Sequence, residues 1–193
     1  AQTGFVAAIA RNTDRLRALT DDLLVLTGLG SGAFMLVQVD LDLRDLVLGV
    51  EKTVGSLVEG RRLDVSFEHP NFPVMVNGDA QRLERVLFQL VSNAVKVTAD
   101  GGRVACRLRV EGGDAVLEVE DTGIGIPAHE HERIFTPFFR TSAARKLAIQ
   151  GTGLGLSIAA PIIEAHAGII TVVSEPQCGA LFTVRLPLVT AQP

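Results

Sequence analysis

The chain has 193 residues, of which 47% are hydrophobic and 21% are charged, with a mean hydropathy of +0.32. This length allows one domain, or one domain with a helical appendage, and the composition excludes a disordered chain because apolar burial can offset the entropy of ordering it. Its 18 basic and 22 acidic residues leave a net charge of −4, so no global attraction draws it to nucleic acid or anionic lipid. Any phosphate must therefore be held locally.

Cysteine usage indicates a reducing compartment, and hydropathy indicates a chain without a membrane span. Cys106 and Cys178 lie far apart without a CxxC pattern or a histidine at ligand spacing, which predicts no zinc site. No apolar run is long enough to span a membrane, so the chain as given is expected to be cytoplasmic, with any membrane anchor lying upstream. The missing initiator Met favours a piece of a longer protein.

The first 30 or so residues form a segment of their own. Apolar residues recur there in alternating steps of four and three, the a/d pattern of a coiled coil, at Phe5, Ile9, Leu16, Leu19, Leu23 and Leu26, with Asn12 on the same seam. An amphipathic helix packed on its own domain is the alternative. Glycines at 28, 30 and 32 then predict a linker, and hence two parts, residues 1–32 and 33–193.

The second part mixes helices with mostly antiparallel strands. Asp40 or Asp42 can cap a helix that runs to about Gly60, and Asp79 can cap a helix over about 80–98. Strands are expected at 34–39, 63–68, 73–76, 103–110, 115–120, 168–174 and 180–187, with a loop-rich stretch over 122–155 and a further helix over 156–166. This order predicts an α/β two-layer sandwich with one sheet covered by helices.

Four short patterns follow one another in this part. On the helix after Asp79, Gln89, Asn93 and Lys96 are related by i, i+4 and i+7, so two amides and an ammonium share one face. An amide oxygen is a hard ligand suited to Mg²⁺, and a lysine is a point charge for phosphate oxygens. A solvent-facing polar stripe is the bland alternative.

The other three patterns combine glycines, a carboxylate and aromatic residues. Asp121 to Pro127 follows a strand, where a carboxylate can accept an N–H and glycines permit a close ligand approach. Gly151 to Leu156 opens a helix, whose free amides and positive dipole end suit a phosphate. It lacks the lysine of a Walker loop and the preceding strand of a dinucleotide fingerprint. Between them, Ile134 to Arg140 holds three phenylalanines, which could simply anchor a loop in the core.

In this order the four patterns resemble the catalytic ATP-binding part of sensor histidine kinases, in the superfamily that includes Hsp90, gyrase and MutL ATPases. The segments at 79–102, 121–127, 134–140 and 151–156 are similar to its N, G1, F and G2 boxes. Residues 11–24 resemble the second helix of the dimerisation and phosphotransfer domain, and the likeness continues through Glu164–His166 to Phe182–Val184.

The resemblance implies a Bergerat-type ATP-binding fold preceded by a coiled-coil-type helix, with ATP and Mg²⁺ bound. By similarity, Asn93 and Gln89 face Mg²⁺, Lys96 contacts phosphate and Asp121 accepts from the adenine amino group. The adenine pocket is shaped by Gly123, Gly125 and Ile126, and the phosphate side and lid hinge by Gly151, Thr152, Gly153, Leu154 and Gly155. In the lid, about 128–150, Arg140 and Arg145 match basic positions near the γ-phosphate or the domain interface and are assigned to catalysis.

Several positions depart from the family pattern. Gln89 stands where most members have an asparagine, and Val97 where an aromatic residue often stacks beside the nucleotide. Ala167 and Gln177 replace frequent glycines, and Pro161 falls inside a predicted helix. Asn93, Asp121 and the glycines of the fourth pattern remain, so nucleotide binding is expected to survive.

The family's phosphoacceptor histidine has no counterpart, because no histidine precedes His69. His129 and His131 are read as a solvated segment rather than a metal pair, and His166 as structural. The leading hypothesis is therefore a catalytic module that phosphorylates a His-bearing dimerisation helix from a missing or separate segment. In the full-length protein, a homodimer is expected to relay the group to a response regulator receiver domain.

Two alternatives stay open. One is a non-catalytic nucleotide-binding or dimerisation partner that regulates another kinase. The other is a gyrase- or MutL-type ATPase, which would need a water-activating carboxylate near Asn93, whereas the nearest one, Glu84, lies on the wrong part of the helix.

Overall fold

The computed structural model describes residue 20 and residues 35–189. The chain divides into two units, residues 1–35 and 36–193. The predicted coiled-coil-type helix, its linker and the predicted boundary at residue 32 lie outside the described residues. Within the described part, every helix is too short or too polar to cross a membrane.

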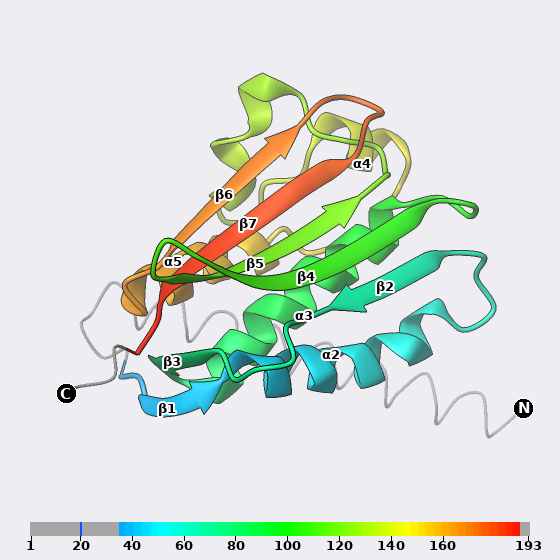
Figure 1. Cartoon of the computed structure of the whole chain (residues 1–193). Helices are drawn as coiled ribbons and strands as arrows, with labels where there is room; N and C mark the ends of the chain where they lie inside the picture. The colour runs from blue at the N-terminus through cyan, green and yellow to red at the C-terminus, as the bar shows by residue number, and fades with distance from the viewer. Residues whose placement is uncertain (1–19, 21–34, 190–193) are drawn as a thin grey trace, which may run out of the picture. The chain divides into compact units, whose positions relative to one another are not determined.

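The second unit contains two sheets and three long helices (Figure 1). The strands are β1 (Val39–Asp42), β2 (Asp64–Glu68), β3 (Met75–Gly78), β4 (Arg103–Glu111), β5 (Asp114–Asp121), β6 (Ile169–Ser174) and β7 (Ala180–Pro187). The helices are α2 (Leu43–Val58), α3 (Ala80–Val97), the short α4 (Ser142–Lys146) and α5 (Gly155–Ala165), with 3-10 turns η1 (Ala128–Glu130) and η2 (Arg133–Phe135).

The larger sheet has five strands in the order β2-β4-β5-β7-β6. Its described pairs are antiparallel except β2 with β4, which run parallel. Helices α2 and α3 pack on each other and on β4, while α5 packs on α3 and β6. In Figure 1 these helices lie on one face of the sheet, which confirms the predicted α/β two-layer sandwich.

Helix α3 lies at the centre of the helical layer and forms for the reasons that the sequence indicated. The Asp79 side chain accepts a hydrogen bond from the Arg82 N–H at 3.1 Å, which satisfies a free donor of the first turn. Six residues predicted for its apolar face are all buried, namely Leu83, Val86, Leu87, Leu90, Val91 and Ala94. The polar residues of the first pattern stand on the remaining surface of this helix.

The first strand is not where the sequence alternation placed it. The expected strand at 34–39 is replaced by β1, which starts at Val39 and pairs with β3 in a separate two-stranded sheet. Val37 and Val39 are 75% and 50% exposed, so their alternation does not reflect a buried face. The Asp42 carboxylate accepts from the Val74 N–H at 3.0 Å, which ties β1 to the chain entering β3.

Ala167 and Gln177 stand where the family often has glycine. Both adopt the left-handed backbone conformation, with φ +56° and φ +64° respectively. Ala167 follows the end of α5, where its N–H donates to the Glu164 carbonyl and the Gly168 N–H donates to the Ile163 carbonyl, both at 2.9 Å. This pair of bonds is the Schellman ending of a helix, which favours glycine at the left-handed position. As predicted, Pro161 lies inside α5.

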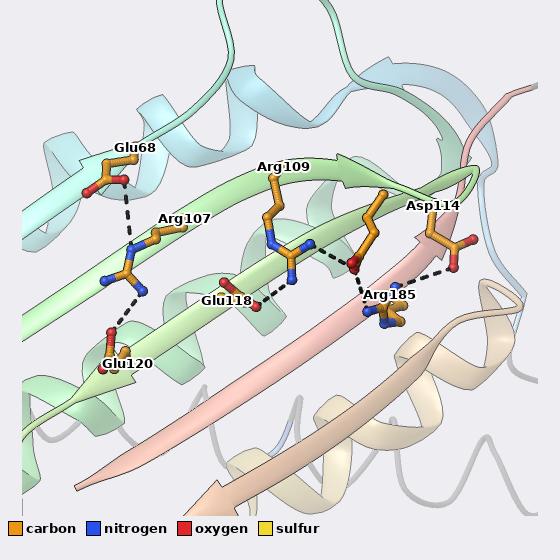
Figure 2. A network of polar contacts seen from close by, with 8 residues as sticks. Glu68, Arg107, Arg109, Asp114, Glu118, Glu120 and Arg185 are labelled. Carbon is orange, nitrogen blue, oxygen red and sulfur yellow. Dashed lines mark hydrogen bonds and ion pairs between the residues drawn. The ribbon is translucent and has the colours of Figure 1, made fainter.

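The face of the large sheet that the described helices leave open carries a network of charges. Figure 2 shows arginines of β4 and β7 pointing toward carboxylates of β5 and of the strand ends. We call this network the ion-pair ladder; it comprises Glu68, Arg107, Arg109, Glu111, Asp114, Glu118, Glu120 and Arg185. Beneath it, Val116 is fully buried although it stands on this face, opposite Arg109 and Arg185 in the strand register.

Candidate functional site

The amides of the first pattern contact each other on α3. The Gln89 Nε2 donates to Asn93 Oδ1 at 2.9 Å, and both side chains are half-buried. Lys96, one turn further on, is exposed. The helix thus presents Asn93 in a fixed orientation, with a second lone pair of its Oδ1 still able to accept a ligand.

The fourth pattern lies against the first. A Cβ atom on Gly155, the first residue of α5, would stand 2.1 Å from Gln89 Cδ and 2.2 Å from its Nε2. A larger residue there would displace the Gln89 side chain from its present position, because real Cβ contacts are never so short. The start of α5, with its free backbone N–H groups, is therefore held beside Gln89 and Asn93.

Asp121 ends β5 and is 4% exposed. Its Oδ1 accepts from the Gly123 N–H at 2.8 Å. Burial raises the pKa of this carboxyl to about 6, against the opposing effect of the Gly123 and Ala180 N–H groups, which favour the charged form. A buried carboxylate with capacity left on its oxygens is suited to recognise a hydrogen-bond donor on a ligand.

The glycines after Asp121 bring this turn against the end of α3 and against the β6–β7 connection. A Cβ on Gly123 would lie 2.6 Å from the Val97 carbonyl oxygen, which also accepts from the Ile124 N–H at 3.3 Å. Gly125 has φ +65°, and its Cβ would lie 1.9 Å from the Glu175 carbonyl oxygen. The first and second patterns therefore meet at Val97.

Ser174, which the sequence did not single out, and His131 both hold Ile126 in place. The Ile126 N–H donates to Ser174 Oγ at 2.8 Å, and Ser174 Oγ donates to the Gly179 carbonyl at 2.6 Å. His131 Nε2 lies 3.0 Å from the Ile126 carbonyl oxygen. The interpretation of His131 as solvated was therefore wrong, because it anchors the turn, whereas His129 is exposed. Neither the role of Ser174 nor that of His131 has a local sequence signal, because each side chain bonds to a backbone atom of Ile126 that only the fold brings close.

The third pattern is attached to the fourth through the backbone. The Phe138 N–H donates to the Gly153 carbonyl at 2.9 Å. Gly153 has φ +76°, and a Cβ on it would lie 2.7 Å from the Phe138 carbonyl carbon. Ile134 is buried, and the Arg133 guanidinium lies over the Phe139 ring at 4.5 Å. The segment is thus anchored in the core by Ile134 rather than by its phenylalanines, of which Phe138 is 67% exposed, and it braces the glycine-rich turn.

The segment expected to be the lid has internal structure. Thr141 caps α4 by accepting from the Ala144 N–H at 3.1 Å, and the buried Glu130 accepts from the Ser142 N–H at 3.1 Å. Arg140 donates to the Ile149 carbonyl, and Arg145 is exposed on α4. Both arginines expected to act in catalysis therefore lie in one folded loop.

The remaining residues of the glycine-rich turn are open to solvent or fix its shape. Gly151 has no atom within 4 Å of a Cβ placed on it, and Thr152 is exposed. The Thr152 hydroxyl accepts from the N–H of the buried Leu154 at 3.3 Å. The turn thus combines an anchored end at Leu154 with an accessible backbone.

A metal ion at this site would need ligands beyond protein carboxylates. In the described part of the chain, no three His, Cys, Asp or Glu side chains cluster to hold a metal. The Asn93 amide oxygen fits Mg²⁺, which in phosphate-transfer sites takes few protein ligands and keeps waters and phosphate oxygens. Gln89 stands beside it, with its Nε2 directed to Asn93.

Comparisons with known proteins agree with this arrangement. A family model described as histidine kinase-, DNA gyrase B- and HSP90-like ATPase matches residues 78–190. The sensor histidine kinase RcsC of Escherichia coli is 36% identical over 188 residues, which are 97% of this chain and 20% of RcsC. The chain thus spans about a fifth of the length of that relative.

Two solved proteins share the architecture. The catalytic domain of the histidine kinase ThkA superposes with a TM-score of 0.68 at 31% identity, over 78% of this chain and 95% of that domain. ThkA has also been solved in complex with the response regulator TrrA. Full-length ShkA in complex with AMPPNP gives a TM-score of 0.81 at 27% identity, over 100% of this chain and 40% of ShkA. This chain belongs to the family of histidine kinase-, DNA gyrase B- and HSP90-like ATPases, with the catalytic-domain fold of the sensor histidine kinases.

Proposed function

We propose that this chain is the ATP-binding catalytic module of a two-component sensor histidine kinase, which transfers the ATP γ-phosphoryl group to a histidine on another segment. One observation carries the proposal: the first, second and fourth patterns meet at α3, with Gly155 against Gln89 and Gly123 against Val97. The AMPPNP bound by ShkA, which has the same fold, supports nucleotide binding at such a site.

Each residue is assigned the chemistry that its environment allows. The Asp121 carboxylate accepts from the exocyclic amino group of adenine, in the turn shaped by Gly123, Gly125 and Ile126. The backbone N–H groups at the start of α5 and the exposed Lys96 face phosphate oxygens. Arg140 and Arg145 bring positive charge from the lid toward the group being transferred.

Asn93 would hold Mg²⁺ through its amide oxygen, and Gln89 would stand beside it. When bound, the metal neutralises charge on the phosphate oxygens. Gln89 keeps the Asn93 amide in one orientation through its 2.9 Å hydrogen bond. Because Gln89 directs its Nε2, a hydrogen-bond donor, toward Asn93, we assign Asn93 rather than Gln89 as the principal protein ligand of Mg²⁺.

The transfer breaks the bond between the γ-phosphorus and the oxygen of ADP and forms a phosphorus–nitrogen bond on an imidazole, which gives up its N–H proton. None of the four histidines of this chain suits the acceptor role. His69, His129 and His131 belong to turns or loops, and His166 is 3% exposed. The acceptor is therefore expected on a dimerisation helix from an upstream segment or a separate chain.

The partners follow from this chemistry. We expect the full-length protein to be a cytoplasmic homodimer, or the cytoplasmic part of a membrane sensor, and to pass the phosphoryl group to an aspartate of a response regulator receiver domain. The complex of ThkA with TrrA supports a partner of that kind. Nucleic acid is not an expected partner, given the net charge of −4.

The test mixes this chain with a His-bearing dimerisation hairpin, Mg²⁺ and γ-labelled ATP. We expect label on the hairpin, and none with the Asp121→Asn variant or with a hairpin whose histidine is changed to alanine. ATP binding by calorimetry without label on the hairpin would contradict the kinase and support a non-catalytic nucleotide-binding partner. Steady release of free phosphate without the hairpin would favour a gyrase- or MutL-type ATPase.

A further inference from the structure

A buried hydrogen-bond junction joins α5 to the start of α3. His166 caps the C-terminal end of α5, and its Nε2 accepts from the Asp79 N–H at 2.9 Å. Its Nδ1 lies 2.7 Å from the Ile162 carbonyl oxygen. Because the backbone N–H donates to Nε2, the ring must be neutral with its proton on Nδ1, which donates to Ile162.

Asp79 serves three segments at this junction. Its Oδ1 accepts from the Arg82 N–H and caps α3, and its Oδ2 accepts from the Val37 N–H, each at 3.1 Å. Its own N–H is the one bound by His166. Gly78 leaves room for the ring, because a Cβ there would lie 2.7 Å from His166 Cδ2.

The opposite end of α5 is equally confined. Gly155 begins the helix directly against Gln89, which donates to Asn93. Besides the packing of its buried face, the helix therefore meets α3 at both ends, through the hydrogen bond at His166 and the contact at Gly155. At a rise of about 1.5 Å per residue these points are roughly 16 Å apart, so a tilt at one end moves the other.

The middle of α5 is the weaker part of this helix. Pro161 has no N–H and removes one of the helix's own hydrogen bonds. The buried Ile158, Ile162 and Ile163 pack this helix into the core, and the two end contacts add to that packing in fixing its position on α3. Because the backbone of Gly155 leaves no room for even a Cβ beside the Gln89 amide, we expect a displacement of α5 to shift that amide, and with it Asn93.

We propose that His166 is a positioning residue of the nucleotide site, which acts through α5 to set the Gln89–Asn93 pair against the glycine-rich turn. This inference rests on the proposed function, in that Asn93 and the turn are taken to bind Mg²⁺ and the phosphates of ATP. The His166 ring touches no part of that site itself. The residue acts by fixing the position of α5 against α3.

The test compares His166→Ala with His166→Gln, whose amide oxygen can still accept from the Asp79 N–H. The matched control is Val54→Ala, which removes buried volume from α2, a helix whose main packing is on α3 and β4. Two readouts are used below the unfolding temperature of every variant: the NMR resonances of the Gln89 side-chain amide without nucleotide, and ATP affinity with Mg²⁺ by calorimetry.

We expect His166→Ala to shift the Gln89 amide resonances and to weaken ATP binding about tenfold or more, the scale of effect of a sub-ångström to ångström misplacement in a preorganised site. His166→Gln should restore much of both. Val54→Ala should lower the unfolding temperature and leave both readouts unchanged.

An ATP affinity that is unchanged in His166→Ala overturns the proposal, whatever that variant's stability, and so does an equal loss of affinity in Val54→Ala. If His166→Ala does not fold, His166→Gln and the control decide by the same readouts. A wild-type chain that binds no ATP would refute the proposed function, while the Gln89 resonances would still decide whether His166 positions α5.

Discussion

Asp121, which we propose binds adenine, is buried in surroundings that oppose its ionised form. Burial raises the pKa of its carboxyl to about 6, yet the acceptor role toward an adenine amino group needs the ionised form. The Gly123 N–H favours the carboxylate through its 2.8 Å hydrogen bond, which keeps most of the group ionised at neutral pH. Under the proposed function, the proton on Asp121 is therefore expected to be coupled to nucleotide binding.

This coupling predicts weaker ATP binding in acid. Because the ligand selects the carboxylate, affinity is full above the pKa and falls as the pH drops through about 6, by up to about tenfold per unit below it. Calorimetric titrations between pH 5 and pH 8 measure the profile. Asp121→Asn should bind weakly with a flat profile over this range, because an amide places N–H donors toward the base. A wild-type profile that is flat down to pH 5 would contradict the assignment.

At the scale of elements, the end of α5 is built for glycine but carries alanine. Ala167 occupies the left-handed position of the Schellman ending with φ +56°. Ala167→Gly is expected to stabilise the protein by roughly 0.5–1 kcal/mol, because the strain of about 1–2 kcal/mol exceeds the added entropy of the unfolded chain. Thermal and urea unfolding measure the gain.

The matched control is the same change two residues earlier. Ala165 is the last helical residue of α5 and is exposed, so Ala165→Gly should destabilise by up to about 1 kcal/mol. Opposite signs for the two variants support the capping explanation. Destabilisation by both would show that the left-handed residue carries little strain.

The ion-pair ladder explains how the sheet exposes one face to water. Arg109 donates to Glu118 and to Glu111, both at 2.8 Å, and its side chain stands beside the buried Val116. The hydrogen bond to Glu118 is the main cause that raises the pKa of Arg109 above its usual range. The ladder therefore joins four strands, β2, β4, β5 and β7, through side chains as well as through the backbone.

Arg109→Ala is expected to lower the free energy of unfolding by about 1 kcal/mol, from the lost contacts to Glu118 and Glu111 and the uncovering of Val116. The loss should shrink in about 0.5 M salt, which screens the ionic part. Arg62→Ala is the control, because Arg62 is 88% exposed and lies 3.9 Å from its partner Asp100. Equal effects of the two substitutions would show that the ladder adds nothing.

The sequence predicted those elements whose signals are local. Asp79 and the apolar spacing after it specify α3, and the Glu111–Asp114 turn specifies the β4–β5 hairpin. The partners of β1 and the buried roles of Ser174 and His131 could not be predicted, because each depends on a residue or backbone atom brought close by the fold. The residues of the candidate site were predicted from the sequence, but their arrangement was not. The structure adds that Gly155 lies against Gln89.

At the scale of the whole molecule, every residue assigned to ATP and Mg²⁺ lies between Gln89 and Gly155, within the unit of residues 36–193. That unit has its own core, formed by the helical layer and the inner face of the large sheet. The first unit, residues 1–35, contains the segment that resembles the second dimerisation helix. Nucleotide binding and phosphoryl transfer should therefore be separable.

Removal of residues 1–35 tests this separation. The shortened chain should fold and bind Mg²⁺–ATP within about twofold of the full chain, because a site on a rigid, independently packed unit keeps its geometry. It should lose transfer of label to a His-bearing hairpin, since the reacting atoms must be brought together by an interaction outside the nucleotide site. Calorimetry and the labelling assay measure the two activities, and Asp121→Asn in the full chain gives the reverse control, with hairpin association retained and ATP binding weakened. Undiminished transfer by the shortened chain would show that residues 1–35 do not present the acceptor.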